Sequence, residues 1–391
     1  MHKKSLFRQT FLLLLVILST NTAAQNPVPI APDLDGTAWI LIDANTGFVI
    51  AENNADEPLP PASLAKMMTT YIAVKQIKQG TLSDYEEVLV SDNAWEKGGA
   101  KTDGSTMFLS PRTTVPVIDL MRGIIIQSGN DAAIALAEHI SGSEDEFSNL
   151  MNDYAVELGM NKTFYYNSTG LPAEGMVSSA RDQAKLAKAI IEIDPDYYAL
   201  YSEKYFQHND INQPNRNRLL WRDSSVDGLK TGYTKAAGYC LVASARRKDM
   251  RLISVLLGSS SAESRARQTQ KLLSFGFRHF DTKKIYTQGD ILKDNAKVWF
   301  GVDDFLNLTI AEDIVLTLPR RSEKNLVANI IVDQKLEAPI SAGEELGRLQ
   351  VSLAENILID VPLVAEKEIL ESDLFSRFYD WIVLFFTDLM S

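Results

Sequence analysis

The spacing of apolar residues changes along this chain of 391 residues, and the change limits the folds open to it. From residue 64 to about residue 200, apolar side chains recur every three or four positions, which predicts a series of helices. Short apolar runs bounded by turn residues lie before and after this region and predict strands. These runs span residues 38–51, 226–231, 239–245 and 251–257. A last helix is expected at 262–276, so the pattern predicts a sheet covered by helices.

A second domain is predicted where the pattern changes again, near residue 282. Residues 283–371 contain short β-like segments separated by turns, which are typical of a small all-β domain. The preceding domain is expected to span 25–282. Residues 372–391 then repeat apolar side chains at helical spacing.

This terminal helix is expected to lie in the plane of a membrane surface. Arg377, Asp380 and Asp388 interrupt its apolar pattern, so it is poorly suited to span a bilayer. Its acidic face would gain nothing from anionic lipids. The alternative is a helix packed on its own domain or in a homodimer.

Residues 1–24 resemble a secretory signal, with a basic start, a short apolar core and small residues before the expected cleavage site. A retained N-terminal anchor is the alternative. Cys240 is the single cysteine, so no internal disulfide can form, and its apolar neighbours predict a buried strand residue. The net charge of −12 disfavours nucleic-acid binding.

Histidine and metal chemistry are disfavoured by the histidine content. The chain has four histidines, none paired at ligand spacing, and it lacks an H-E-x-x-H segment. A zinc hydrolase and a Ser-His-Asp hydrolase are therefore disfavoured, and no metal or other cofactor is expected.

One stretch points to a different nucleophile. Pro60-Pro61-Ala62-Ser63-Leu64-Ala65-Lys66 opens an amphipathic pattern that Gly80 would end as a C-cap. Ser63 and Lys66 are three residues apart, so their side chains would share one helix face. An amine whose pKa is lowered by burial can take the proton of such a hydroxyl. By itself S-x-x-K is a weak signal, and a helix start with a surface lysine is the alternative.

Two further motifs strengthen the signal. Ser128-Gly129-Asn130 lies in a break between predicted helices, and Lys230-Thr231-Gly232 lies on a predicted strand. S-x-x-K, S-x-N and K-T-G, in this order, are the signature of penicillin-binding proteins and class A β-lactamases.

The whole mature chain resembles D-alanyl-D-alanine carboxypeptidases of the low-molecular-mass penicillin-binding type. The resemblance implies an α/β (α+β) transpeptidase fold, in which helices cover an antiparallel sheet and a helical subdomain is inserted, followed by the β domain and the amphipathic helix. It implies two ligands, peptidoglycan stem pentapeptides ending in D-Ala-D-Ala and β-lactam antibiotics. It also implies export to the periplasmic face of the inner membrane, with peripheral attachment.

The resemblance implies a chemical role for each motif residue. Ser63 would attack the carbonyl between the terminal D-alanines, with Lys66 as its base. Ser128 would pass a proton to the leaving amine, and Asn130 would hold the substrate amide. The backbone N–H groups of Ser63 and Tyr233 would form the oxyanion hole.

A substrate that ends in a carboxylate also needs positive charges to bind this group and room for its backbone beside the strand. Lys230 would add positive potential, Thr231 would bind the terminal carboxylate, and Arg265 would be a second contact to it. Gly232 would let the substrate lie along the strand. Arg216 is a peripheral candidate, and a surface arginine is the alternative for Arg265.

Three alternatives stay open. A β-lactamase of class A would need a glutamate in an E-x-x-L-N segment, whereas residues 163–168 contain none. A DD-endopeptidase shares the chemistry, but the β domain and terminal helix favour a carboxypeptidase. A non-catalytic scaffold for cell shape is disfavoured by the three intact motifs.

Overall fold

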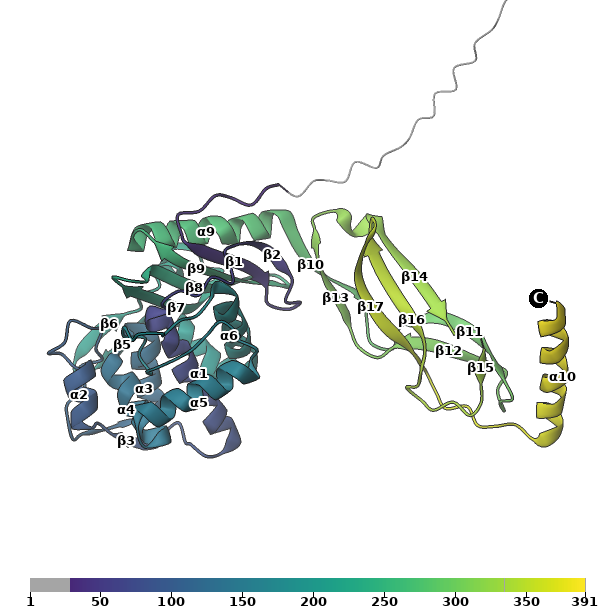
Figure 1. The fold of residues 1–391 in the computed structure, drawn as a ribbon, viewed down its shortest axis with the longest axis horizontal. Helices are drawn as coiled ribbons and strands as arrows, with labels where there is room; N and C mark the ends of the chain where they lie inside the picture. Colours follow the sequence, from purple (N-terminus) through teal and green to yellow (C-terminus); the bar gives the residue numbers. More distant parts are fainter. Residues whose placement is uncertain (1–28, 334, 391) are drawn as a thin grey trace, which may run out of the picture.

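A computed structural model describes residues 29–333 and 335–390, so the predicted signal segment 1–24 lies outside the described residues. The N-terminal domain contains a five-stranded sheet in the order β2-β1-β9-β8-β7 (Figure 1). All four pairs of neighbouring strands are antiparallel. The strands are β1 (Ala38–Asp43), β2 (Val49–Asn53), β7 (Val226–Thr234), β8 (Gly238–Arg247) and β9 (Met250–Ser259). The predicted sheet of strands from both ends of this domain is therefore confirmed.

Alternating side chains of the sheet enter two separate cores. Ile40 and Ile42 of β1 join the core formed with the helical region, whereas Trp39 and Leu41 face α9 (Ala262–His279). Figure 1 shows α9 on one side of the sheet and the other long helices of this domain on the opposite side. The sheet is thus buried on both faces, as the apolar strand sequences require.

The helix after the sheet is longer than expected. We expected it to end at Gly276, but α9 continues to His279. A Cβ at Gly276 would lie 2.6 Å from Leu252 Cδ1 and 2.8 Å from Leu41 Cδ2. The glycine therefore serves close helix–sheet packing here and does not stop the helix.

The inserted region contains the predicted series of helices between residues 64 and about 200. They are α1 (Lys66–Gln79), α3 (Val117–Arg122), α4 (Asn130–Ser141), α5 (Glu144–Glu157), α6 (Ala180–Ile193) and α7 (Pro195–Ala199). Two more helices, α2 (Asp92–Gly98) and α8 (Leu219–Arg222), were not predicted. Two small two-stranded sheets accompany them, β3 (Glu87–Leu89) with β4 (Thr114–Pro116) and the hairpin β5 (Tyr205–His208) with β6 (Ile211–Pro214). Helix α2 lies in the segment 91–114, whose Gly98, Gly99, Gly104 and Pro111 favour loops. It forms because Ser91 caps it, accepting a hydrogen bond from Ala94 N at 2.9 Å.

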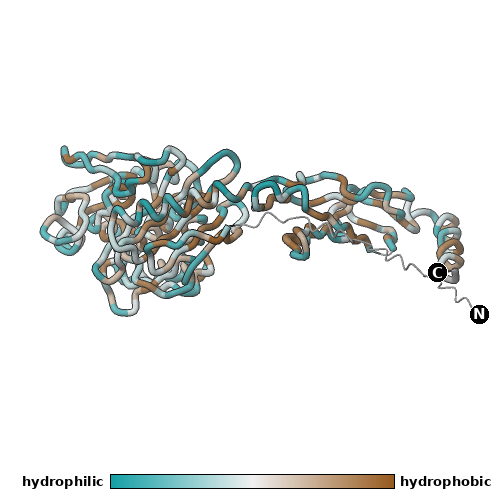
Figure 2. Tube along the Cα trace, turned by 90° about the horizontal axis from the view of Figure 1, so that it is seen from above, coloured by the Kyte–Doolittle hydropathy of each residue, from teal (hydrophilic) through white to brown (hydrophobic). Residues whose placement is uncertain are grey.

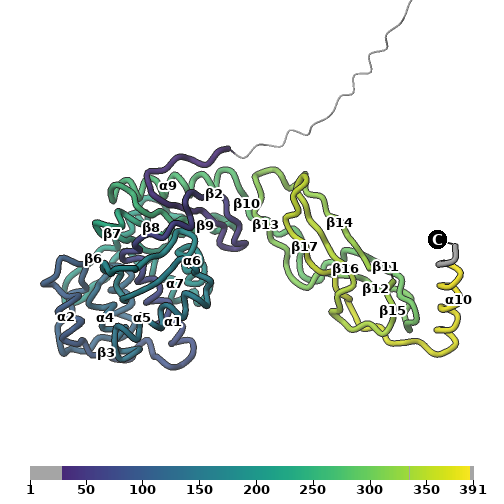
Figure 3. The backbone as a smooth tube through the Cα atoms, in the orientation of Figure 1, coloured from purple at the N-terminus to yellow at the C-terminus, as the bar shows by residue number. Residues whose placement is uncertain are grey.

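The C-terminal domain is built from strands, as predicted. Strand β10 (Phe280–Tyr286) pairs with β13 (Ile314–Pro319), and six further strands form a sheet in the order β14-β16-β17-β12-β11-β15. These are β11 (Ile291–Trp299), β12 (Phe305–Ile310), β14 (Leu326–Val332), β15 (Leu336–Glu337), β16 (Glu345–Leu353) and β17 (Asn356–Ala365). The predicted boundary at residue 282 falls inside β10. Helix α10 (Leu374–Met390) lies at the end of this domain far from the first domain (Figure 3).

A buried carboxylate connects the two domains. Asp43, at the end of β1, is fully buried and accepts hydrogen bonds from two hydroxyls of the C-terminal domain. These come from Thr317 Oγ1, at 2.8 Å, and from Thr282 Oγ1. Asn45 N donates to the other carboxylate oxygen at 2.9 Å. The β1–β2 hairpin is therefore attached to strands β10 and β13.

Replacing Asp43 by alanine should loosen this contact, because two buried threonine hydroxyls lose their charged acceptor. Hydrogen bonds to charged groups contribute about 1.5–3 kcal/mol each, so the free energy of unfolding should fall by at least about 2 kcal/mol. Urea unfolding followed by tryptophan fluorescence measures the loss. The matched control is Asp281→Ala, which removes a partly exposed ion pair with Arg320 and should change stability by less than about 1 kcal/mol. Equal losses in the two variants would contradict the role of Asp43.

Candidate active site

Ser63 lies on a tight turn beside a pocket of about 690 Å³. The turn is a 3₁₀ segment, Ala62–Ala65, that leads directly into α1, so Ser63 precedes the α-helix instead of lying in its first α-turn. Gly80 ends α1 in the left-handed conformation, with φ 75°, as predicted. Helix α1 itself is not amphipathic over its first nine residues, because other elements bury it on all sides from Lys66 to Val74.

Lys66 is fully buried, and its amine is held among three oxygens. Nζ donates to Asn130 Oδ1 at 2.7 Å and to Thr169 O at 2.5 Å, and it lies 3.3 Å from Ser63 Oγ. The first two oxygens can only accept hydrogen bonds. When the amine is neutral, its two N–H groups can serve them, which leaves its lone pair for the Ser63 hydroxyl.

The electrostatics favour that neutral form. Burial, followed by the positive charge of Arg216, lowers the pKa of Lys66 from 10.5 to about 7, while Asp131 and Glu144 act in the opposite direction. An amine with this pKa is substantially unprotonated near neutral pH. The pair can therefore act as nucleophile and general base.

Ser128 occupies a strained position beside this pair. It follows a π-helical turn, Gly123–Gln127, and adopts a left-handed backbone conformation with φ 67°. Its buried Oγ has no hydrogen-bond partner among the described residues. Strain combined with an unsatisfied buried hydroxyl is unfavourable unless a ligand supplies the missing partner. Ser128 is thus placed to exchange hydrogen bonds with a bound molecule.

Asn130 begins α4 and ties the neighbouring loop to the site. Its backbone N–H donates to Ser105 O at 2.8 Å, and its side-chain oxygen accepts from Lys66. Because the oxygen is occupied, the side-chain NH₂ is the group left for a ligand.

Strand β7 provides another wall of the pocket. Thr231, Gly232 and Tyr233 line it, whereas the Lys230 side chain is buried and donates from Nζ to Thr231 O at 3.0 Å. Burial, together with the charges of Lys66, Arg216 and Arg265, holds the pKa of Lys230 well below its usual value. A bound anion would favour its charged form again.

The tight fit of β7 against the Ser63 turn explains Gly232. A Cβ at this position would lie 3.2 Å from Ala62 Cβ and 3.3 Å from Pro61 O. The glycine therefore allows β7 and the turn to approach closely, in addition to the space that we expected it to leave for a ligand.

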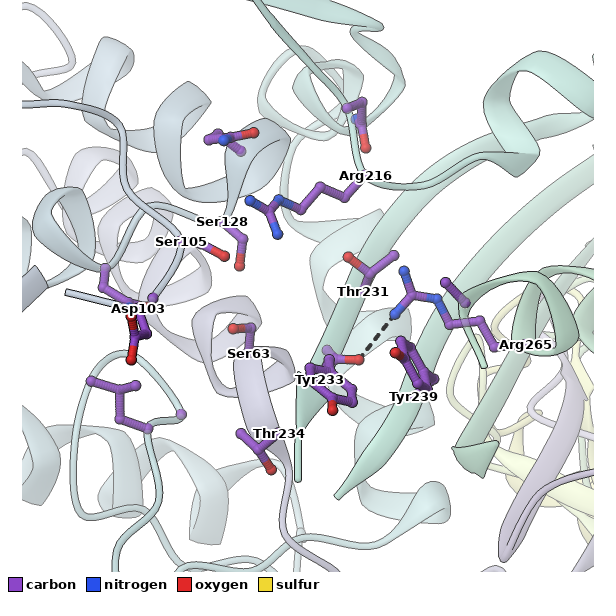
Figure 4. A pocket seen from close by; sticks show the side chains of 18 of the residues that line it. Ser63, Asp103, Ser105, Ser128, Arg216, Thr231, Tyr233, Thr234, Tyr239 and Arg265 are labelled. Atoms are coloured by element: carbon purple, nitrogen blue, oxygen red, sulfur yellow. Dashed lines mark hydrogen bonds between the residues drawn. The ribbon is translucent and has the colours of Figure 1, made fainter. Parts of the chain in front are cut away.

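Arg265 points into the pocket from α9 (Figure 4). Its Nη1 donates to Gly232 O at 3.0 Å and to Cys240 O at 3.3 Å. Burial lowers its pKa to about 10. Arg216 also lines the pocket and extends toward Ser128 in Figure 4, and burial lowers its pKa too. The alternative of a surface arginine does not apply to Arg265.

The sequence motifs did not indicate that the loop 167–170 contacts Lys66. Thr169 supplies a carbonyl to Lys66, and Gly170 lies so close to the Ser63 turn that a Cβ would be 1.8 Å from Ala62 O. Asn167 Oδ1 organises the loop by accepting from Thr169 N and Gly170 N. The Asn-Ser-Thr-Gly sequence is a turn signal, but it does not indicate which side chain the turn contacts.

The segment 91–114 forms one edge of the pocket. Asp103, Gly104 and Ser105, within the segment 91–114, form the wall opposite Thr231 and Arg265 (Figure 4). No group of three or more His, Cys, Asp or Glu residues that could hold a metal occurs among the described residues.

Two family models and several known proteins match the chain. Residues 20–261 match the family model described as D-alanyl-D-alanine carboxypeptidase, and residues 280–371 match that of the penicillin-binding protein 5 C-terminal domain. The chain is 43% identical to the D-alanyl-D-alanine carboxypeptidase DacC of Escherichia coli, covering 95% of this chain and 94% of that one. It is 31% identical to the D-alanyl-D-alanine endopeptidase of E. coli over only 54% of this chain.

Solved structures support the fold. Penicillin-binding protein 5 of Haemophilus influenzae is 38% identical, with a TM-score of 0.81, and the match covers 87% of this chain and 99% of that one. Penicillin-binding protein 6B of E. coli is 34% identical with a TM-score of 0.73, covering 86% and 97%. The expected transpeptidase fold is confirmed. With matches of this extent and a buried Ser63–Lys66 pair at the pocket, the chain belongs to the D-alanyl-D-alanine carboxypeptidase family.

Proposed function

We propose that this protein removes the terminal D-alanine from peptidoglycan stem pentapeptides through an acyl-enzyme on Ser63. The observation that carries the proposal is the buried Lys66 amine, 3.3 Å from Ser63 Oγ, with a pKa lowered to about 7. Such an amine can accept the hydroxyl proton at neutral pH, which the serine needs to become a nucleophile.

The reaction proceeds in two half-reactions. Lys66 takes the proton as Ser63 Oγ attacks the carbonyl carbon between the two D-alanines, and the backbone N–H groups of Ser63 and Tyr233 stabilise the oxyanion. Ser128 relays the proton taken up by Lys66 to the leaving amine, the C–N bond breaks, and D-alanine departs. Water then hydrolyses the ester and restores Ser63.

The substrate is held mainly through its terminal carboxylate. Thr231 and Arg265 bind this group on one side of Ser63. The negative charge of the bound carboxylate favours the charged form of the buried Lys230 on β7. The Asn130 side-chain NH₂ binds the peptide amide.

β-Lactams acylate the same serine, and their release is slow. Of the described residues that line the pocket, Asp103 is the sole acid, and it lies on the loop opposite Thr231. Glu144 accepts hydrogen bonds from Ser168 N and Ser168 Oγ, so it is engaged in holding the loop. A weak β-lactamase activity is therefore the lesser candidate. The shorter match to the endopeptidase favours carboxypeptidase over DD-endopeptidase activity.

Mass spectrometry after incubation with penicillin tests the nucleophile. We expect one adduct, on Ser63, and D-alanine release from a D-Ala-D-Ala pentapeptide. Ser63→Ala should lose the adduct, and turnover should fall by roughly 10⁴-fold or more, because the whole nucleophilic pathway is removed. Ser105→Ala, a matched change in the same pocket, should keep the adduct. Folded, penicillin-acylated wild type that releases no D-alanine would support the non-catalytic scaffold instead.

The pH profile should report the Lys66 amine. The base must be neutral, so kcat/KM should rise with pH, by about tenfold per unit below the pKa of about 7, and level off above it. Initial rates of D-alanine release across this range measure the profile. Lys66→Arg, whose buried guanidinium stays protonated, should be inactive throughout. A profile that is flat on both sides of pH 7 would rule out Lys66 as the base.

We also propose that residues 1–24 direct export, that residues 25–282 form the catalytic domain and 283–371 a separate all-β domain, and that α10 attaches the protein to the periplasmic face of the inner membrane. No helix among the described residues is long and apolar enough to cross a membrane. Figure 2 shows α10 as a strongly apolar segment. The large apolar side chains it exposes are Leu374, Phe375, Phe378, Tyr379, Trp381, Phe385 and Phe386.

Two acidic residues at this helix, Asp373 and Asp380, are compatible with this role because both have hydrogen-bond partners in the protein. Asp380 accepts a hydrogen bond from Phe300 N at 2.8 Å, so it faces the β domain. Asp373 caps the helix by accepting from Phe375 N and Ser376 N. These two carboxylates therefore have structural partners, which leaves the aromatic side chains for the interface.

Deleting residues 372–391 should release the protein from membranes without loss of activity, because α10 lies far from the N-terminal domain that contains the pocket (Figure 3). Flotation with lipid vesicles and D-alanine release measure the two effects. Trp381→Asp in the full chain should weaken flotation, whereas Thr387→Asp, the control of equal charge, should weaken it less. A truncated protein that still floats would refute the anchor. A homodimer that dissociates on truncation would show that the helix serves dimerisation.

A further inference from the structure

The pocket beside Ser63 is electrically polarised. Of the described residues that line it, four carry charged side chains, namely Arg216, Arg218, Arg265 and Asp103. In Figure 4, Arg265 and Asp103 lie on opposite sides of Ser63. One end of the pocket therefore attracts an anion, and the other end has a single carboxylate that attracts a cation.

The carboxylate of Asp103 is exposed and free. It makes no hydrogen bond or ion pair with any residue in the described part of the chain. The other pocket charges are partly engaged, because Arg218 lies 3.7 Å from Glu263 and Arg265 donates to backbone carbonyls. Asp103 therefore keeps its full capacity for a ligand.

The loop that bears Asp103 is braced against the catalytic residues. Thr102 Oγ1 donates to Gly99 O at 2.9 Å, and Ser105 O accepts from Asn130 N at 2.8 Å. A Cβ at Gly104 would lie 2.4 Å from Asn130 Nδ2, so the loop passes directly over this side chain. The backbone on both sides of Asp103 is therefore held in place, which reduces the entropy lost on binding.

The proposed function defines the orientation of a peptide in the pocket. This inference rests on that proposed function. If the terminal carboxylate is bound by Thr231 and Arg265 while Ser63 attacks the preceding carbonyl, the rest of the peptide must extend to the other side of Ser63. That side is the wall with Asp103 (Figure 4). The residue before the two D-alanines then has its side chain near this carboxylate, since an extended residue spans only about 3.3–3.6 Å.

We propose that Asp103 is a specificity residue that binds a side-chain ammonium group on the residue preceding D-Ala-D-Ala. The preferred substrates are then peptides with a basic side chain at this position, over those in which the amine is acylated. The contact is exposed to solvent, so its effect should be moderate, roughly three- to tenfold in kcat/KM, and should weaken with salt.

A pair of tripeptides tests the inference. The substrates are Nα-acetyl-L-Lys-D-Ala-D-Ala, with a free side-chain amine, and its Nα,Nε-diacetyl form. We expect wild type to prefer the free amine by roughly three- to tenfold, mainly through KM, at about 20 mM salt and less at about 500 mM. Asp103→Asn should remove this preference, and Asp103→Lys should reverse it toward an Nε-succinyl peptide. Asp92→Asn, which removes an exposed carboxylate paired with Arg112 outside the pocket, should retain it.

The outcomes separate this inference from the proposed function. The role of Asp103 would be overturned if wild type and Asp103→Asn showed the same preference for the free amine, or if wild type showed no preference. Either result would leave the proposed carboxypeptidase activity intact. Failure of wild type to release D-alanine from either peptide would overturn the proposed function, and this inference with it. Penicillin labelling of each variant checks that the site is folded.

Discussion

The buried amine of Lys66 is the feature on which the rest of the site depends. A fully buried lysine is stable only if its polar atoms are satisfied and its charge can be lost. Asn130 and Thr169 satisfy two N–H groups, and burial lowers the pKa to about 7. The same environment therefore makes the residue tolerable to the fold and basic toward Ser63.

Several unfavourable features are gathered around this amine. Ala62 and Ser128 are non-glycine residues with positive φ, and the Ser128 hydroxyl has no partner among the described residues. Arg216 and Arg265 lie close enough to Lys230, as does Lys66, to disfavour its charged form. Such a site can exist only because large cores on both faces of the sheet hold it in place. A bound carboxylate would relieve part of this repulsion, so the site is preorganised for its ligand.

Much of the fold could be predicted because its elements have clear local signals. The strands at 226–231, 239–245 and 251–257 and the end of α1 at Gly80 appear where the apolar spacing and the capping residue place them. The predictions were wrong where contacts with residues distant in sequence determine the local structure. Gly276 looked like a helix stop, but it is a packing contact with Leu41 and Leu252. Helix α1 looked amphipathic, but the helices and sheet around it bury its polar residues as well.

Sequence alone determined the residue chemistry of the site, a serine and a lysine three positions apart, with Ser128-Gly129-Asn130 and Lys230-Thr231-Gly232 later in the chain. These depend only on residue type and spacing. Tertiary structure decided which groups meet: the Thr169 carbonyl at Lys66, Arg265 turned inward onto Gly232, and Asp43 joined to Thr282 and Thr317. The physical reason is that desolvation and hydrogen bonding of a side chain are determined by its neighbours in space, most of which are distant in sequence.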